Sequence, residues 1–97
     1  MYVLNAERSI RMSKKNYVII PESVVKYPNL SMADKYVFGV LKSYGTINVP
    51  YVLEMRDLAE VLGCTVQNAY HYVNKLREHG LIIKSGHGAN SKITVLY

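Results

Sequence analysis

The sequence predicts a single α+β domain in which three amphipathic helices are followed by a C-terminal β-hairpin. Apolar residues recur every three or four positions in residues 31–44, 54–62 and 65–77, which is the period of a helix with one buried face. Two β-rich segments, 81–85 and 92–97, flank a Gly-rich turn, a pattern typical of a hairpin. The chain has 97 residues, 49% of them apolar and 20% charged, which is enough for one hydrophobic core but not for a second domain.

Residues 1–16 form a basic segment that precedes the domain itself, which we assign to residues 17–97. Within eight positions this segment carries Arg8, Arg11, Lys14 and Lys15. Such a segment is typical of an arm that reaches the phosphates or the minor groove of a nucleic acid, and these four residues are its candidate contacts. A solvated tail and an added strand are alternatives that the sequence does not separate from the arm.

Two short elements are expected at the start of the domain. Residues 17–20 all favour β-structure and predict a short strand. Pro21 suits the first position of a helix over residues 22–26. That helix is expected to end before Pro28, because the residue that precedes a proline avoids the helical conformation.

The first long helix is predicted over residues 31–44. Ser31 and Asp34 have the spacing of a capping box, in which each side chain satisfies the backbone N–H of the other residue. Apolar residues follow at helical spacing, and Gly45 supplies a stop that tolerates the left-handed conformation. Residues 46–53, where apolar side chains alternate around a proline, are then expected to form a short edge strand.

The segment from residue 54 to residue 77 predicts two helices joined by a tight turn. The first helix, residues 54–62, has a single apolar stripe and ends at Gly63. The second helix, residues 65–77, carries Ala69, Val73 and Leu76 on one face. Its other face carries Gln67, Asn68, His71, Asn74 and Lys75. We therefore expect one face to pack against the core and the other to offer hydrogen bonds.

The order helix, strand, helix, turn, helix, hairpin resembles the winged helix-turn-helix superfamily. The resemblance covers residues 31–97 and depends on Leu58-Ala59, Gly63-Cys64-Thr65, Val73, Leu76 and Gly80-Leu81-Ile82. It implies that the second helix of the pair is a DNA recognition helix and that the hairpin is a wing. Residues 18–21, 30–31 and 34–36 are similar, more loosely, to the N-terminal domains of plasmid and phage replication initiators. The chain also resembles small winged-helix plasmid partition proteins.

A recognition helix in the major groove gives the polar residues of the predicted helix their roles. Gln67 and Asn68 are each able to make paired hydrogen bonds to adenine, and Thr65 is able to reach a thymine methyl group or a phosphate. Lys75 is expected to meet a guanine or a phosphate. The remaining helix candidates are Tyr70 and His71, which are expected to project toward the DNA backbone, and Asn74. In the wing, the candidate contacts to phosphates or a minor groove are Lys84, His87, Asn90, Ser91 and Lys92.

The net charge favours a polyanionic partner, whereas catalytic, metal-binding and membrane roles are not expected. The formal charge is +5, and from residue 64 onward four basic residues accompany one acidic residue. Cys64 is the only cysteine, and the pair that it could form with His71 has no acidic residue nearby to orient it for catalysis. The three histidines lack the spacing of metal ligands. No apolar run approaches the roughly 20 residues that span a bilayer, and no signal peptide is apparent. We expect a cytoplasmic protein without a cofactor.

These observations together predict a sequence-specific protein that binds double-stranded DNA as a homodimer. Two recognition helices on a repeated or palindromic site raise the affinity through shared attachment. The dimer surface is expected in the N-terminal segment, the first long helix or another surface, because the chain ends within the wing strand. The expected role is a plasmid- or virus-borne partition-site binder or transcriptional repressor, associated with a plasmid or the nucleoid.

Two alternatives stay open at this point. One is the DNA-binding domain of a longer replication initiator. The other is a winged-helix module that binds a partner protein instead of DNA, since nine tyrosines can furnish a protein-binding surface.

Overall fold

The computed structural model describes residues 2–5, 17–86 and 90–97. In chain order the elements are β1 (Tyr2–Asn5), β2 (Tyr17–Ile20), α1 (Glu22–Val25), α2 (Met32–Ser43), β3 (Tyr51–Glu54), α3 (Met55–Leu62), α4 (Val66–Glu78), β4 (Ile82–Ser85) and β5 (Asn90–Val95). None of the helices in these ranges is long and apolar enough to cross a membrane. The predicted contacts Arg8, Arg11, Lys14, Lys15 and His87 lie outside the described residues.

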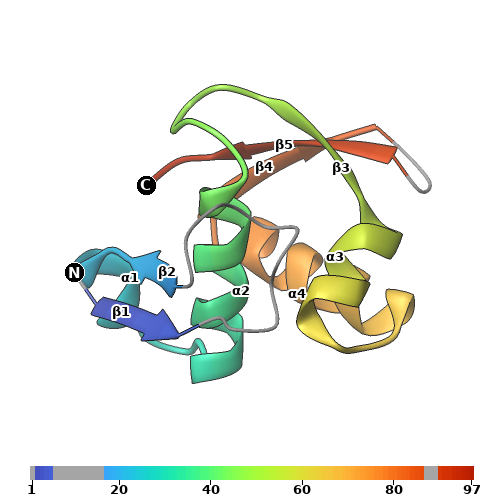
Figure 1. Ribbon diagram of the computed structural model, residues 1–97. Helices are drawn as coiled ribbons and strands as arrows, with labels where there is room; N and C mark the ends of the chain where they lie inside the picture. The colour runs from blue at the N-terminus through green and yellow to red at the C-terminus, as the bar shows by residue number, and fades with distance from the viewer. Residues whose placement is uncertain (1, 6–16, 87–89) are drawn as a thin grey trace.

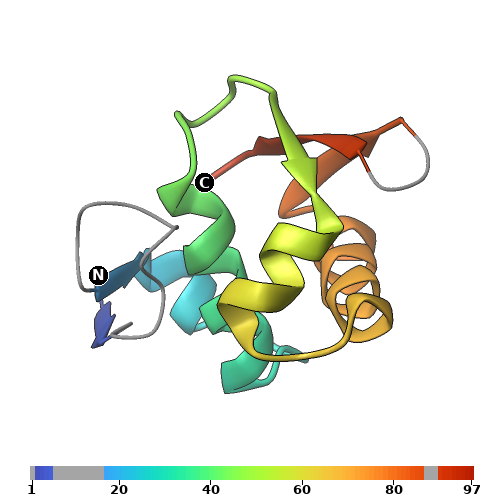
Figure 2. The same ribbon diagram turned by 45° about the vertical axis from the view of Figure 1, so that its right-hand side comes forward.

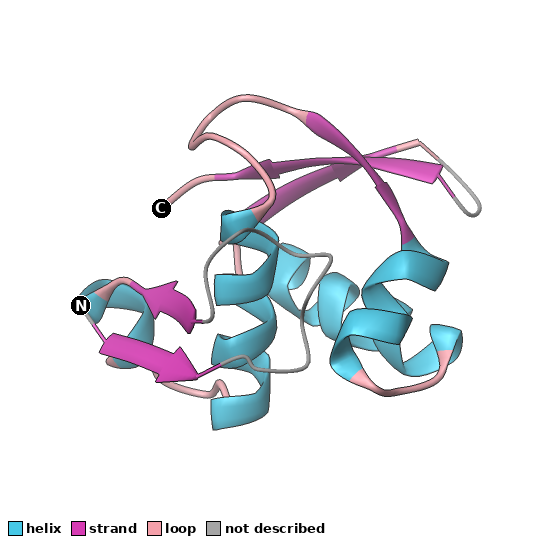
Figure 3. Ribbon diagram, in the orientation of Figure 1, coloured by secondary structure: helices cyan, strands magenta, loops and turns pink. Residues whose placement is uncertain are grey.

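Helix α2 lies between two groups of elements (Figure 1). Strands β1 and β2 with helix α1 lie on one side of α2, and helices α3 and α4 lie on the other. A sheet formed by β3, β5 and β4 lies across one end of the helices, as Figures 1 and 2 show from two directions. The described chain is therefore an α+β fold with four helices and a three-stranded antiparallel sheet whose helices lie on one side (Figure 3).

The three-stranded sheet confirms the predicted C-terminal hairpin. Strand β4 pairs antiparallel with β5, with Ile82 opposite Val95, and β3 pairs with the other edge of β5. The strand expected over residues 46–53 forms only from residue 51. Before it the chain turns, and the N–H of Val49 donates to the carbonyl of Thr46 at 3.1 Å.

Part of the N-terminal segment is a strand of the fold. Strand β1 pairs antiparallel with β2, with Tyr2 opposite Ile20 and Asn5 opposite Tyr17. Among the three interpretations of residues 1–16, the added strand therefore applies to residues 2–5. The boundary that we placed before residue 17 separates two strands that are hydrogen-bonded to each other.

The helix ends lie within one residue of the predicted positions, because local side chains determine them. Ser31 and Asp34 form the predicted capping box at the start of α2, with bonds in both directions. Gly63 ends α3 in the left-handed conformation with a φ of 69°. Thr65 caps α4, since its hydroxyl accepts the N–H of Asn68 at 3.1 Å.

A single core joins the four helices, β2 and the three-stranded sheet. Its buried side chains come from the four helices, from β2 and from the face of the three-stranded sheet that lies toward the helices. Two tyrosine hydroxyls also tie separate elements together: Tyr27 donates to the carbonyl of His79 at 2.9 Å, and Tyr51 donates to that of Leu41 at 2.6 Å. Helix α4 is thus held from several sides, which fixes the direction of its remaining free face.

Candidate nucleic-acid interface

Helix α4 buries one face and exposes the other, as the sequence predicted. Ala69, Val73 and Leu76 are fully buried, whereas Gln67, Asn68 and His71 are exposed. Within the described part of the chain, no hydrogen bond or ion pair engages the side chains of these three exposed residues. They are therefore available to an external partner from a helix whose position is fixed by the core.

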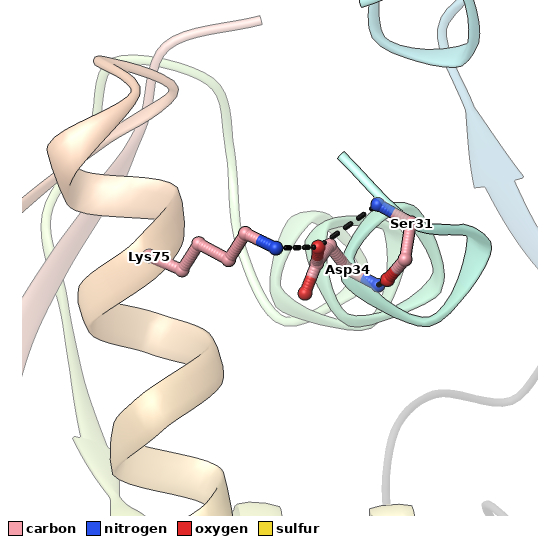
Figure 4. A network of polar contacts seen from close by, with 3 residues as sticks. All are labelled: Ser31, Asp34 and Lys75. Atoms are coloured by element: carbon pink, nitrogen blue, oxygen red, sulfur yellow. Dashed lines mark hydrogen bonds and ion pairs between the residues drawn. The ribbon is translucent and has the colours of Figure 1, made fainter. Parts of the chain in front are cut away.

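Lys75 does not belong to this free face. Its Nζ lies 2.7 Å from Oδ2 of Asp34 in the first turn of α2, and Figure 4 shows the side chain reaching across from α4. The same carboxylate oxygen accepts the backbone N–H of Ser31 at 2.9 Å, and the Asp34 side chain is only 3% exposed. This ion pair does not test the prediction that Lys75 contacts DNA, but it engages the ammonium group within the fold, so we leave Lys75 out of the free face. Its ammonium group joins α4 to α2.

The ionised state of the Asp34 carboxyl group supports this structural role. Burial by itself raises the pKa of the carboxyl group, because the carboxylate loses hydration. The ion pair with Lys75 and the hydrogen bonds from Ser31 together outweigh burial and hold the pKa below its ordinary value. The ion pair is consequently intact at neutral pH.

Lys84 lies where strand β4 meets helix α4. Its Nζ is 3.5 Å from Oδ1 of Asn74, at the long limit of a hydrogen bond, and 5.1 Å from the centre of the Tyr70 ring. Burial lowers the pKa of Lys84, and the nearby charge of Arg77 lowers it further. Tyr70 is half-buried against the core and its ring lies beside Lys84, and its contact with a DNA backbone stays a prediction.

The hairpin directs its candidate residues to opposite faces of the sheet. Side chains alternate along β5, so Ser91 faces the helices and Lys92 faces away from them. Ser91 is 1% exposed and its Oγ has no hydrogen-bond partner in the described structure. A buried hydroxyl does not reach DNA, so that prediction is wrong for Ser91. Asn90 begins β5, and its side chain is outside the described part.

The surface around α4 is polar more than positive. Residues 17–97 contain eight basic and six acidic side chains, a net charge of +2, so residues 1–16 supply the larger part of the total of +5. Lys75 is paired with Asp34, and Lys26 pairs with Glu22 at 2.7 Å. Arg77 and Glu78 are both exposed in the last turn of α4, so their charges offset each other. The part of α4 that carries Gln67, Asn68 and His71 therefore offers mainly hydrogen bonds.

Cys64 and the acidic side chains do not form a site of their own. The Cys64 thiol is half-buried in the turn between α3 and α4, its Sγ lies 3.4 Å from the carbonyl oxygen of Thr65, and burial raises its pKa. A thiol with a raised pKa is a poor nucleophile at neutral pH. Among residues 2–5, 17–86 and 90–97, no three His, Cys, Asp or Glu side chains are grouped to hold a metal ion.

The role of Asp34 as the partner of Lys75 could not be predicted from the sequence. The spacing from Ser31 marked Asp34 as a helix cap, and no local pattern connects it to a lysine so far along the chain. The alternation of residues in β5 did carry a signal for the buried position of Ser91, because Ile93 and Val95 share its face.

A comparison of the chain with protein-family models, with curated proteins and with solved structures found no match.

Proposed function

We propose that this chain is a winged helix-turn-helix protein that binds duplex DNA with sequence specificity. In this proposal α3 and α4 form the helix-turn-helix, α4 is the recognition helix, and the β4–β5 hairpin is the wing. One observation carries it: Gln67, Asn68 and His71 share the exposed side of a helix whose opposite side is anchored in the core. A single α-helix fits the major groove, and amide side chains there make paired hydrogen bonds to adenine.

Lys84 is the phosphate contact that we propose beside α4. The Tyr70 ring and Asn74 hold its ammonium group at the border between the helix and the hairpin. Burial removes part of the hydration of the Lys84 ammonium group. A DNA phosphate at this position would compensate for that loss, since a nearby opposite charge favours the charged form of lysine. The basic residues of the N-terminal segment remain proposed backbone contacts. The proposed interface leaves out Lys75, which is ion-paired with Asp34, and Ser91, which is buried. It also leaves out Lys92, because this residue lies on the face of the sheet that points away from α4.

The biological setting that we propose is a plasmid- or virus-borne factor that binds as a homodimer to a repeated or palindromic site. Partition-site binding and transcriptional repression both use such a site, and a replication initiator is the alternative. A winged-helix module that binds protein instead of DNA is the second candidate, because residues 17–97 carry a net charge of only +2 and Glu78 lies on the exposed part of α4. An electrophoretic shift with random duplex separates these two classes.

Substituting the exposed amides should relax the sequence preference of binding. The preferred site is first selected from a random duplex pool, and the dissociation constants for that site and a scrambled duplex are then measured by titration. For Gln67→Ala and Asn68→Ala we expect the ratio between them to fall about 10- to 100-fold, because a lost paired contact to a base costs about 1–3 kcal/mol.

The matched control for these variants is Ser23→Ala, an exposed polar residue of α1. This variant should leave both dissociation constants unchanged. An unaltered ratio in both amide variants would show that the α4 face does not read the bases, and the proposed recognition helix would then be withdrawn.

Substituting Lys84 should weaken binding to every duplex alike. We expect Lys84→Ala to lower the affinity for selected and scrambled duplexes by the same factor. The slope of log affinity against log salt concentration should become smaller by about 0.9, the value for one phosphate contact in B-DNA. Titrations at several salt concentrations measure this slope. Lys26→Ala, which removes one charge from α1, is the control and should leave the slope unchanged.

A further inference from the structure

In the part of the chain that the structure describes, the face of the three-stranded sheet that points away from the helices is exposed. We call it the outer face; its residues are Val52, Glu54, Ile83, Ser85, Lys92 and Thr94, as the strand register and the alternation of side chains require. Its two large apolar side chains are more than half exposed: Val52 at 65% and Ile83 at 53%. The opposite face of the sheet is buried against the helices. The exposure of Val52 and Ile83 is therefore confined to the outer face and does not reflect poor packing of the whole sheet.

Further apolar side chains lie beside the outer face. In Figures 1 and 2 the segment from α2 to β3 loops beside the sheet, and the N–H of Asn48 donates to the carbonyl of Val95 in β5 at 2.9 Å. This segment carries Ile47 at 40% exposure and Val49 at 51%. Including Val52, Ile83 and Tyr97 after β5, five of the seven large apolar side chains exposed in the described part belong to this sheet or its adjoining segments. Scattered exposed apolar residues are normal, but such a concentration in and around one sheet marks an interaction site.

The charges on the outer face are one acid and one base. Glu54 and Lys92 are both exposed there, and the register makes them diagonal neighbours on β3 and β5. Neither forms an ion pair within residues 2–5, 17–86 and 90–97. A polyanion would meet Glu54 as well as Lys92, so this face is poorly suited to DNA.

We propose that a second copy of this chain covers the outer face, related to the first by a twofold axis. In such an interface each surface is its own partner, so Lys92 of each copy meets Glu54 of the other. Val52 and Ile83 lie on the two outer strands, on either side of β5, and add apolar contacts beside these two pairs. A surface with one acid, one base and exposed apolar side chains is complementary to itself in this way. Two three-stranded sheets can pack face to face with their strands nearly aligned.

The size of the surface determines how strong this contact is. The exposed apolar area is on the order of a few hundred Å², whereas stable interfaces bury about 800 Å² on each partner. The free dimer should therefore be weak, and two copies on adjacent half-sites should be stabilised by their high effective concentration. The inference rests on the homodimer of the proposed function and identifies the surface that forms it.

The test uses charge reversal and sedimentation equilibrium without DNA, at protein concentrations from about 10 µM to about 1 mM, where an interface of this size should assemble. The wild-type chain should dimerise. Lys92→Glu alone and Glu54→Lys alone should each be monomeric, because each would place like charges opposite one another twice. An equimolar mixture of the two variants should form a heterodimer, because every pair across that interface is again opposite in charge.

A second comparison tests the contribution of the exposed apolar side chains. Val52→Lys should raise the dimer dissociation constant at least tenfold, whereas Met32→Lys should leave it unchanged, since Met32 is 58% exposed on α2, away from the sheet. Thermal melts of all variants confirm that they are folded. The proposal is overturned if the wild-type chain stays monomeric at about 1 mM, or if it dimerises while the mixture of charge variants does not.

DNA measurements on the same variants distinguish this inference from the proposed function. If Lys92→Glu and Glu54→Lys bind one half-site as the wild-type chain does but lose the advantage of two adjacent half-sites, both proposals stand. If the wild-type chain dimerises and binds no duplex, the DNA-binding proposal fails alone. If it binds duplex but never assembles through the outer face, this inference fails alone.

Discussion

Replacing Asp34 by alanine is expected to lower the free energy of unfolding by about 2–4 kcal/mol. The substitution removes one half of the capping box, which contributes about 1 kcal/mol, and leaves the half-buried ammonium of Lys75 without its partner, which costs a further 1–3 kcal/mol. Denaturant unfolding followed by circular dichroism measures the change. A loss below about 0.5 kcal/mol would show that the network in Figure 4 contributes little to stability.

Two further variants separate the cap from the ion pair. Asp34→Asn keeps an oxygen that can accept the N–H of Ser31 and removes only the charge, so its effect should be smaller than that of Asp34→Ala. Lys75→Met removes the other partner and leaves the carboxylate buried. Asp34→Asn and Lys75→Met each break the same ion pair. The double variant that combines them should therefore be less destabilised than the sum of the two single effects.

The pH dependence of stability provides an independent check on Asp34. Its pKa is lowered in the folded chain, so its contribution to stability is complete above the ordinary value of 3.8. That contribution is lost as the pH falls through the lowered folded value. The wild-type chain should therefore lose more stability than Asp34→Asn when the pH is lowered through this range. Equal pH profiles would contradict the assigned ionisation.

Replacing Gly39 by alanine is expected to destabilise the fold by about 2–3 kcal/mol, although alanine favours helix by about 1 kcal/mol over glycine. The added methyl group would lie 2.1 Å from Cγ1 of Val18 and 3.1 Å from Cγ1 of Ile20, where α2 packs against β2. Both strand residues are fully buried, so neither can move aside without disturbing the core. Thermal and denaturant unfolding measure the loss.

The reason for this loss can be tested by providing room for the methyl group. Val18→Ala leaves a cavity and is destabilising by itself, but combined with Gly39→Ala it should give a double variant more stable than the sum of the two predicts. Additive effects would show that steric overlap with Val18 is not the cause. Gly63→Ala is the comparison for backbone strain alone: its φ is 69° and its added methyl group has no atom within 4 Å, so we expect a loss of about 1 kcal/mol.

The helices and most of the strands were predictable because short-range features define them. The Ser31–Asp34 capping box, the left-handed Gly63 and the Thr65 cap act within one turn, and each helix ends within one residue of its predicted limit. The split between the buried and exposed faces of α4 also follows from helical spacing. The α+β class and the exposure of Gln67, Asn68 and His71 could therefore be read from the chain itself.

The positions of the lysines could not be predicted in this way. Lys75 and Lys84 are both basic residues beside the same helix face, yet one forms an ion pair with Asp34 and the other lies against the Tyr70 ring. A long flexible side chain can reach several partners, and which of them is near depends on how α2, α4 and β4 pack together. The strand at residues 2–5 could not be predicted for the same reason, since it forms only by pairing with β2 later in the chain.

The sequence by itself determined the helices of this protein, their ends and the hydrogen-bonding face of α4, because these depend on neighbours along the chain. Only the tertiary structure decided that Lys75 joins α4 to α2, that Ser91 is buried, and that Lys84 and Lys92 lie on opposite faces of the sheet. These outcomes depend on which helix covers which face of the sheet. That choice is made when residues far apart in the chain come into contact, and no local pattern records it.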